Sequence, residues 1–369
     1  MKNLVLYSII SLIIIASCNS KMPNSDTVAT GMDSLNHHNS ITPILITEPS
    51  QYDTDDPAIW INPTDISKSM ILGTDKGDDF DKNATLLAYD LDGKIIKEKS
   101  ISGLTRVNNV DIAYGFQVNG KPTDIALVTE RGRDLLRIFS IPAMNAIDNG
   151  GIPVFDGEEI KSPMGIATYH SPVSDKFYAI ISRKSGESGS YLWQYELIEQ
   201  KGKVSAKLVR KFGKFEGGKE IESIAVDEEL GFIYYSDEGK GVRKYQAEPE
   251  LGNEELALFA TEDFTDDHEG ISIYKFPDGT GYILVSDQQA NQFHIFPRGG
   301  VQENPHQHNL LKVVKVSTNE SDGSEITYHS FNGKFPGGLF VAMSDDKTFH
   351  FYSWKDIAGK ELKIYQEDN

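Results

Sequence analysis

The sequence predicts an all-β protein, a single six-bladed β-propeller with four-stranded blades. From Pro43 onward no convincing long stretch has the apolar spacing of a helix, and short β-rich runs alternate with Gly, Asn, Asp and Pro turns. One layout of strands then occurs six times, at intervals of about 50 residues, a period typical of propeller blades. A β-sandwich with insertions is the alternative, but it gives no reason for six similarly spaced copies.

Each repeat has an apolar strand, a turn, a second apolar strand that ends in Ser or Thr plus polar residues, and a third strand. The second strands run, in order, through ILGTDK, ALVTER, AIISRK, YYSDEG, LVSDQQ and AMSDDK. An isoleucine marks the first strand of every repeat, and successive isoleucines are 53, 54, 58, 47 and 55 residues apart. These isoleucines are Ile59, Ile112, Ile166, Ile224, Ile271 and Ile326.

The N-terminus predicts export and a lipid anchor. Residues 1–17 combine Lys2, a short apolar run and small residues, which is typical of a secretory signal peptide. The run Ile15-Ala16-Ser17-Cys18 resembles a bacterial lipobox, in which Cys18 is lipidated after cleavage. An ordinary signal peptide with an incidental cysteine is the alternative. We expect a flexible tether over residues 18–42, a propeller over residues 43–369, and a protein anchored to a bacterial outer membrane or cell surface, otherwise periplasmic or extracellular.

Charge and cysteine content exclude several classes of protein. The 369 residues include 36 Lys+Arg and 55 Asp+Glu, so the formal net charge is −19 and nucleic-acid binding is disfavoured. The single cysteine rules out a disulfide framework, a Cys-rich zinc site and a thiol-redox pair within one chain. Because a closed propeller leaves few open sheet edges, we expect a monomer that touches the membrane only through its lipid.

Charged residues recur where the second strands end. Equivalent positions of the repeats should lie on one rim around the propeller axis. The third residue of each Ser/Thr-x-x triplet is a cation in three consecutive repeats and an oxygen-bearing residue in the next three. In order these residues are Lys76, Arg131, Lys184, Glu238, Gln288 and Asp346. Carboxylates also precede first strands, at Asp53, Asp55, Asp56, Glu222 and Glu269. Solvated charges at loop ends are the alternative interpretation.

This division into a basic half and an acidic half indicates a site for a polyanion. Clustered carboxylates without His or Cys are hard oxygen ligands and suit Ca²⁺ rather than zinc. Lysine and arginine donate charge-assisted hydrogen bonds to phosphate oxygens. The sequence has no G-x-S-x-G nucleophile elbow and no phosphate-binding G-x-x-x-x-G-K-[ST] loop. We interpret His306 and His308 as part of a surface loop rather than as zinc ligands.

Several stretches in a fixed order resemble the β-propeller phytases, also called alkaline or Bacillus-type phytases. The resemblance runs from about residue 48 to about residue 357. The stretches that carry it are residues 55–60 (DDPAIW), 89–94 (YDLDGK), 108–111 (NNVD), 176–179 (KFYA), 194–197 (QYEL), 247–249 (AEP) and 269–270 (EG).

The resemblance implies a six-bladed propeller that binds several Ca²⁺ ions and hydrolyses phosphomonoesters of myo-inositol hexakisphosphate, taken as its calcium complex. It implies attack by a metal-activated water without a covalent phosphoenzyme. Lys76, Arg131 and Lys184 match the phosphate-binding cations and, with Glu238, form the expected catalytic set. The positions that match calcium-binding or site-lining residues are Asp55, Asp56, Glu222, Glu238, Asp267, Glu269, Gln288 and Asp322.

Three departures qualify this resemblance. Met164 stands where the family usually has a tyrosine, and a thioether is a poor calcium ligand and no hydrogen-bond donor to phosphate. The loop of residues 77–83 is longer than expected and acidic, and the acidic segment before the last blade is shortened to Asp322 and Gly323. Two other functions therefore stay open: a calcium-dependent lactonase or esterase on a related propeller, and a propeller that binds polyanions without catalysis.

Overall fold

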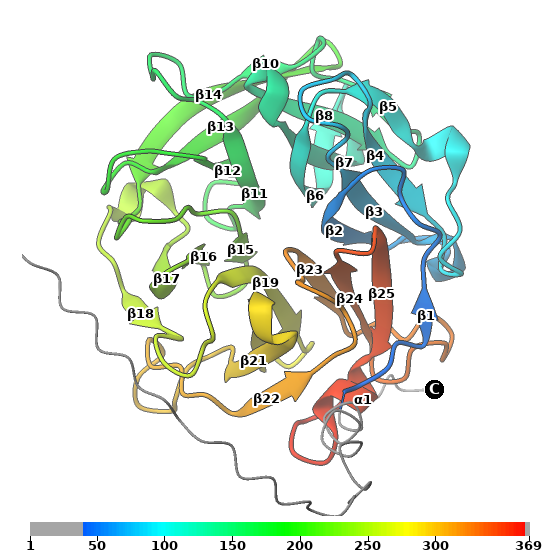
Figure 1. Cartoon of the computed structure of the whole chain (residues 1–369). Helices are drawn as coiled ribbons and strands as arrows, with labels where there is room; N and C mark the ends of the chain where they lie inside the picture. The colour runs from blue at the N-terminus through cyan, green and yellow to red at the C-terminus, as the bar shows by residue number, and fades with distance from the viewer. Residues whose placement is uncertain (1–39, 366–369) are drawn as a thin grey trace, which may run out of the picture. The chain divides into compact units, whose positions relative to one another are not determined.

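Six antiparallel sheets are arranged as the blades of a propeller around a central axis (Figure 1). The structure is a computed structural model that describes residues 40–365. The prediction of a six-bladed, nearly all-β fold is confirmed. The predicted signal peptide, Cys18 and most of the tether lie outside the described residues. Among residues 40–365, every helix is too short or too polar to span a bilayer.

The blades follow one another along the chain, each from the innermost strand outward. Blade 1 contains β2 (Thr54–Trp60), β3 (Met70–Asp75), β4 (Ala84–Tyr89) and β5 (Ile101–Leu104). Blade 2 contains β6 (Val107–Val118), β7 (Lys121–Glu130), β8 (Leu135–Ile141) and two short outer strands, β9 (Asn145–Ala146) and β10 (Ile152–Pro153). Blade 3 contains β11 (Pro163–His170), β12 (Phe177–Arg183), β13 (Leu192–Gln200) and β14 (Lys203–Phe212).

The second half of the ring has the same plan. Blade 4 contains β15 (Ile224–Asp227), β16 (Phe232–Asp237), β17 (Gly241–Gln246) and β18 (Ala257–Phe259). Blade 5 contains β19 (His268–Lys275), β20 (Gly281–Asp287), β21 (Gln292–Pro297) and β22 (Lys312–Lys315). Blade 6 contains β23 (Ser324–Thr327), β24 (Leu339–Ser344), β25 (Thr348–Ser353) and β1 (Leu45–Ile46). The described helices are α1 (Trp354–Ala358) and the 3-10 turns η2 (Ile66–Lys68), η3 (Lys97–Lys99), η4 (Arg131–Arg133), η5 (Pro249–Leu251) and η6 (Gln288–Ala290).

The N-terminal strand closes the ring. β1 pairs with β25 in the register Leu45↔Phe351 and Ile46↔His350, so the outermost strand of blade 6 comes from the other end of the domain (Figure 1). The sequence repeat did not predict this pairing. Because closure joins the two ends of the domain, it protects the ring from opening at the last blade.

The repeated isoleucines lie together at the axis. All six are in the innermost strands and line one central cavity of about 540 Å³. The repeated Ser/Thr residues instead join neighbouring blades: the hydroxyl of Thr129 donates to the carbonyl of Met164 (2.5 Å), and that of Ser236 donates to the carbonyl of Glu269 (2.8 Å). Apolar side chains fill the spaces between blades, as between blades 1 and 2. The repeated residues therefore stabilise contacts at the axis and between blades as well as within each blade.

Candidate active site

One backbone contact places the predicted rim residues at equivalent positions. In five blades the N–H of the third residue of the Ser/Thr-x-x triplet, which directly follows the second strand, donates to a carbonyl in the segment before the first strand. The pairs are Lys76–Asp53 (2.7 Å), Arg131–Arg106 (2.9 Å), Lys184–Ser162 (2.9 Å), Glu238–Glu220 (3.3 Å) and Gln288–Asp267 (3.3 Å). Five of the six side chains predicted at this rim therefore begin from the same backbone position.

Blade 6 departs from the pattern by one residue. Asp345, and not the predicted Asp346, donates its N–H to the carbonyl of Asn319 (2.9 Å). The β24–β25 turn is tight, since Ser344 pairs with Thr348. Asp346 lies within that turn and accepts a hydrogen bond from the hydroxyl of Thr348 (2.5 Å). The spacing of the triplet could not reveal this shift, because it depends on where the turn begins.

Lys76 lies in a carboxylate environment. Its Nζ is 3.1 Å from Asp55 Oδ1, 3.4 Å from Asp53 Oδ2 and 3.5 Å from Asp322 Oδ2. Burial alone would lower the pKa of Lys76, but the charges of Asp55 and Asp322 hold this pKa well above its ordinary value. Lys76 therefore remains charged across the physiological pH range.

The other cations of the rim differ in their partners. Lys184 forms an ion pair with Glu220, and its side chain is 43% exposed. The Nε of Arg131 is buried and has no hydrogen-bond partner within residues 40–365. Lys219, which the sequence did not single out, contacts Asp266 (2.9 Å) and Asp267. Carboxylates of the acidic half of the rim therefore form ion pairs with Lys184 and with Lys219.

Asn108 links the two halves through its amide. Its Nδ2 donates to Asp55 Oδ2 (3.0 Å) and to Glu222 Oε1 (2.8 Å), which come from blades 1 and 4. Asn108 is almost completely buried, and its Oδ1 accepts no hydrogen bond in the part of the chain that the structure describes. Its amide therefore fixes two carboxylates relative to each other.

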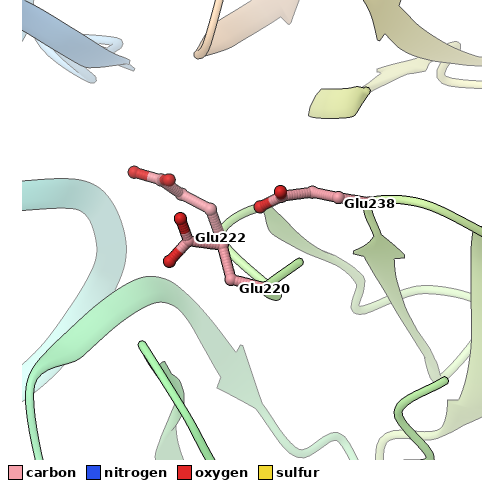
Figure 2. A group of neighbouring side chains, drawn as sticks. All are labelled: Glu220, Glu222 and Glu238. Atoms are coloured by element: carbon pink, nitrogen blue, oxygen red, sulfur yellow. The ribbon is translucent and has the colours of Figure 1, made fainter. Parts of the chain in front are cut away.

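Three glutamates form the centre of the acidic half. One carboxylate oxygen each from Glu220, Glu222 and Glu238 lies within 4.8 Å of the others, and the three side chains extend toward a common space (Figure 2). Burial, with the charges of Glu220 and Asp267, raises the pKa of Glu238 to about 8. Burial, with the charge of Asp55, raises the pKa of Glu222 well above its ordinary value.

The remaining predicted ligands surround this centre. Burial, followed by the charges of Glu238 and Glu222, raises the pKa of Glu269. The side-chain amide of Gln288 donates a hydrogen bond to Asp322. Burial, followed by the charge of Asp55, raises the pKa of Asp322 to about 7. The structure thus brings Asp55, Glu222, Glu238, Asp267, Glu269, Gln288 and Asp322 to one rim or its edge.

Asp56 has different surroundings from Asp55. It lines the central cavity, and its Oδ2 accepts a hydrogen bond from the N–H of Val110 (3.0 Å). The β2–β3 register shifts between Thr54 and Pro57, so Asp55 and Asp56 lie in an irregular part of the strand, and their carboxylates have different partners. Asp111 and Glu325 line the same cavity.

The donor set fits Ca²⁺. Oxygen ligands lie about 2.3–2.6 Å from Ca²⁺, so ligands on opposite sides of the ion are at most about 5 Å apart, as in this cluster. Among the described residues, Glu220 Oε2, Glu238 Oε1 and Glu269 Oε2 are buried without a hydrogen-bond donor. Because unpaired buried carboxylates are costly, these oxygens are suited to a bound cation.

Sequence reasoning missed Glu220, Asn108 and Lys219. Glu220 carried a usable signal, since it lies two residues before Glu222 and alternate residues of an extended segment point to the same side. Asn108 belongs to the quoted NNVD stretch, but its contacts depend on how blades 1, 2 and 4 meet. For Lys219 we find no signal in the sequence.

Met164 is 1% exposed. Its carbonyl accepts the Thr129 hydrogen bond between blades 2 and 3. The buried thioether adds no polar group to the rim. The following Gly165 has no room for a side chain, because a Cβ there would lie 1.7 Å from the carbonyl oxygen of Glu222. Residues 164–165 therefore serve the contact between blades.

Comparison with known proteins gives three findings. The family model described as Phytase matches residues 2–360. The chain is similar to a 3-phytase of Bacillus subtilis (strain 168), with 30% identity over 344 residues that cover 87% of this chain and 85% of that protein. Among solved structures it is similar to a luciferin-regenerating enzyme, with a TM-score of 0.49, 13% identity, and coverage of 82% of this chain and 92% of that chain.

Proposed function

This chain belongs to the phytase family, and we propose that it is a calcium-dependent phytase. Its substrate would be the calcium complex of myo-inositol hexakisphosphate, from which it would release inorganic phosphate. One observation carries this proposal: three cations and a cluster of carboxylates lie at one rim of the propeller, and several of these carboxylate oxygens accept no hydrogen bond within residues 40–365. A polyphosphate with bound cations is complementary to both halves.

The cations would bind and orient the phosphate group to be cleaved. Lys76, Arg131 and Lys184 come from consecutive blades, so they can approach one tetrahedral group from different directions. Arginine can donate two hydrogen bonds to such a group, and both lysines add point charges. Asn108 would keep Asp55 and Glu222 in place beside them.

The acidic residues would hold several calcium ions. The proposed ligands are Asp55, Asp56, Glu222, Glu238, Asp267, Glu269, Gln288 and Asp322, and Glu238 also belongs to the proposed catalytic set. Bound calcium would offset the negative charge of the substrate and activate the water that attacks phosphorus. The carboxylates would fix the positions of the cations and exclude water from their buried sides.

A second candidate is a propeller that binds inositol phosphates or other polyanions without cleaving them. The substitution of Met164 for a tyrosine favours it, because the rim loses one polar side chain. A lactonase or esterase could use the acidic half alone, but it would leave Lys76, Arg131 and Lys184 without a role.

The test is phosphate release from phytate by the purified chain, with millimolar calcium and with EDTA. Release that requires calcium would support the proposal. Release that persists in excess EDTA would contradict the calcium requirement. Binding of phytate without any release would favour the non-catalytic propeller, and Met164→Tyr would then be the variant to measure.

We also propose, from the sequence alone, that a propeller domain over residues 43–369 is exported and anchored through a lipid on Cys18. We expect it to be a monomer. The wild-type chain should partition into detergent-rich phase and incorporate labelled fatty acid, whereas Cys18→Ala should do neither. Incorporation of fatty acid by Cys18→Ala would overturn the anchor.

A further inference from the structure

We propose that Glu220 couples the two halves of the rim. In the absence of calcium Glu220 holds Lys184, and when calcium binds Glu220 becomes one of its ligands and releases Lys184 to bind phosphate. This inference rests on the calcium-dependent site proposed above.

The backbone of Glu220 is fixed at the rim. Glu220 lies between β14 and β15, and its carbonyl accepts the N–H of Glu238 (3.3 Å), which is the contact that recurs around the ring. Its side chain is 17% exposed. A fixed backbone and a largely buried side chain limit the positions that the carboxylate can adopt, so its partners are defined.

The two oxygens of Glu220 face different partners. Oε1 accepts a hydrogen bond from the ammonium of Lys184. Oε2 is buried and accepts no hydrogen bond from residues 40–365. One carboxylate thus satisfies a cation of the basic half and retains a free acceptor.

A cation position lies beside this carboxylate. Oxygens of Glu220, Glu222 and Glu238 converge within 4.8 Å (Figure 2). The side chain of Glu238 also has an unpartnered oxygen among the described residues, and Glu238 is only 5% exposed. An ion held there would bind the oxygens that residues 40–365 leave without a hydrogen-bond donor, and Glu220 would be shared between this ion and Lys184.

The two cations would compete for Glu220. A divalent ion bound to the three glutamates lowers the attraction of Glu220 for the ammonium and repels it. Lys184 is 43% exposed, so the released ammonium can reach a ligand in solution. Phosphate oxygens would then replace Glu220 as its partner.

Lys76 offers a contrast within the same rim. Three carboxylates surround its Nζ, and its side chain is 14% exposed. In the described chain, Glu220 is the one carboxylate that forms an ion pair with Lys184. Loss of one partner therefore changes the surroundings of Lys184 far more than those of Lys76, which identifies Lys184 as the responsive cation.

The decisive variant is Glu220→Gln in the full chain, tested by calorimetric titration with calcium and with inorganic sulfate as a tetrahedral oxyanion. We expect calcium to bind about tenfold more weakly, since one ligand loses its charge. In EDTA we expect sulfate to bind about threefold more tightly than to the wild type, because Lys184 is no longer held. In this variant calcium should enhance sulfate binding less than it does in the wild type. Because coupling between two ligands is reciprocal, sulfate should also enhance calcium binding less.

Two further variants define the effect. Lys184→Met should strengthen calcium binding and weaken sulfate binding. Glu216→Gln is the matched control, since it removes the same charge from the same connecting segment but pairs with Lys240 and Arg243. Its calcium and sulfate affinities should stay within about twofold of wild type, as expected for an exposed charge. If Glu220→Gln does not fold, Glu220→Asp is the substitute, because its shorter side chain keeps the charge but moves it away from Lys184 and the ion. Like Glu220→Gln, it should weaken calcium binding and strengthen sulfate binding in EDTA.

The proposal is overturned if Glu220→Gln weakens sulfate binding in EDTA, or leaves calcium binding unchanged. A wild-type chain that binds calcium and hydrolyses phytate, together with a Glu220→Gln variant that behaves like Glu216→Gln, would refute the coupling alone. A wild-type chain that neither binds calcium nor hydrolyses phytate would refute the proposed function itself.

Discussion

Buried charges are arranged in opposite ways at the rim and between blades 4 and 5. The fully buried Arg298 donates from Nε (2.5 Å) and Nη2 (2.6 Å) to the two oxygens of Asp227, and its Nη2 also contacts Glu229 (2.6 Å). At the rim, Glu238 and Glu269 are nearly as buried. Their neighbours are other carboxylates, and each keeps an oxygen without a hydrogen-bond donor in the described residues.

The difference separates paired charges that stabilise the fold from carboxylates that we propose as cation ligands. The Arg298 cluster satisfies itself, as does Arg243 with Asp237 (2.8 Å) and Glu255 (2.6 Å). A buried charge without a partner is costly, so a cluster of them destabilises the protein until a cation completes it. If the rim binds calcium as proposed, the ion links stability and function there.

The largest expected effect on stability comes from breaking the self-satisfied cluster. Arg298→Met leaves Asp227 buried without its cation, which should lower the free energy of unfolding by about 3–5 kcal/mol. Urea denaturation in excess calcium measures this loss, and calcium affinity should not change. A loss below about 1 kcal/mol would mean that burial of Asp227 does not require Arg298.

Arg131→Ala should have the next largest effect, and on activity alone. If Arg131 binds phosphate as proposed, the loss of its guanidinium should lower phosphate release by about 100- to 1000-fold. The free energy of unfolding should change little, because Arg131 Nε has no partner among residues 40–365. Arg133→Ala is the matched control, since this neighbouring arginine is 46% exposed and contacts Glu130 (3.5 Å). Full activity of Arg131→Ala would refute the phosphate site.

Calcium removal should distinguish the two regions directly. With calcium at 100 times its dissociation constant, EDTA should lower the free energy of unfolding by about 2.7 kcal/mol. Thermal melts of the wild type and of Arg298→Met should show the same decrement, because the Arg298 cluster does not depend on the ion. Identical melting temperatures and rates with and without EDTA would defeat the calcium proposal.

The smallest expected effect has an unusual sign. At a pH where Glu269 is ionised, Glu269→Gln removes one of several like charges, so in EDTA it should raise the free energy of unfolding by about 1 kcal/mol. In calcium the same variant should bind the ion more weakly and lose this advantage. Denaturation in both conditions measures the reversal. Destabilisation in EDTA would show that Glu269 already has a partner that its charge stabilises.

The sequence by itself determined the blade and its rim. Six copies of one strand pattern predict six similar sheets, because strand alternation and turn residues act within about 50 residues of chain. The same pattern located Lys76, Arg131, Lys184, Glu238 and Gln288, since a position just after a strand has the same place in every blade. Local rules sufficed because these features repeat.

Only the tertiary structure decided what meets across the ring. Three contacts join distant parts of the chain. β1 pairs with β25, and Asn108 donates hydrogen bonds to Asp55 and Glu222. Glu220 forms an ion pair with Lys184 and also lies beside the carboxylates of Glu222 and Glu238. The radius of the ring, the rotation between blades and the exact start of each turn set these contacts. None of the three is a property of a single repeat, so the sequence pattern could not contain them.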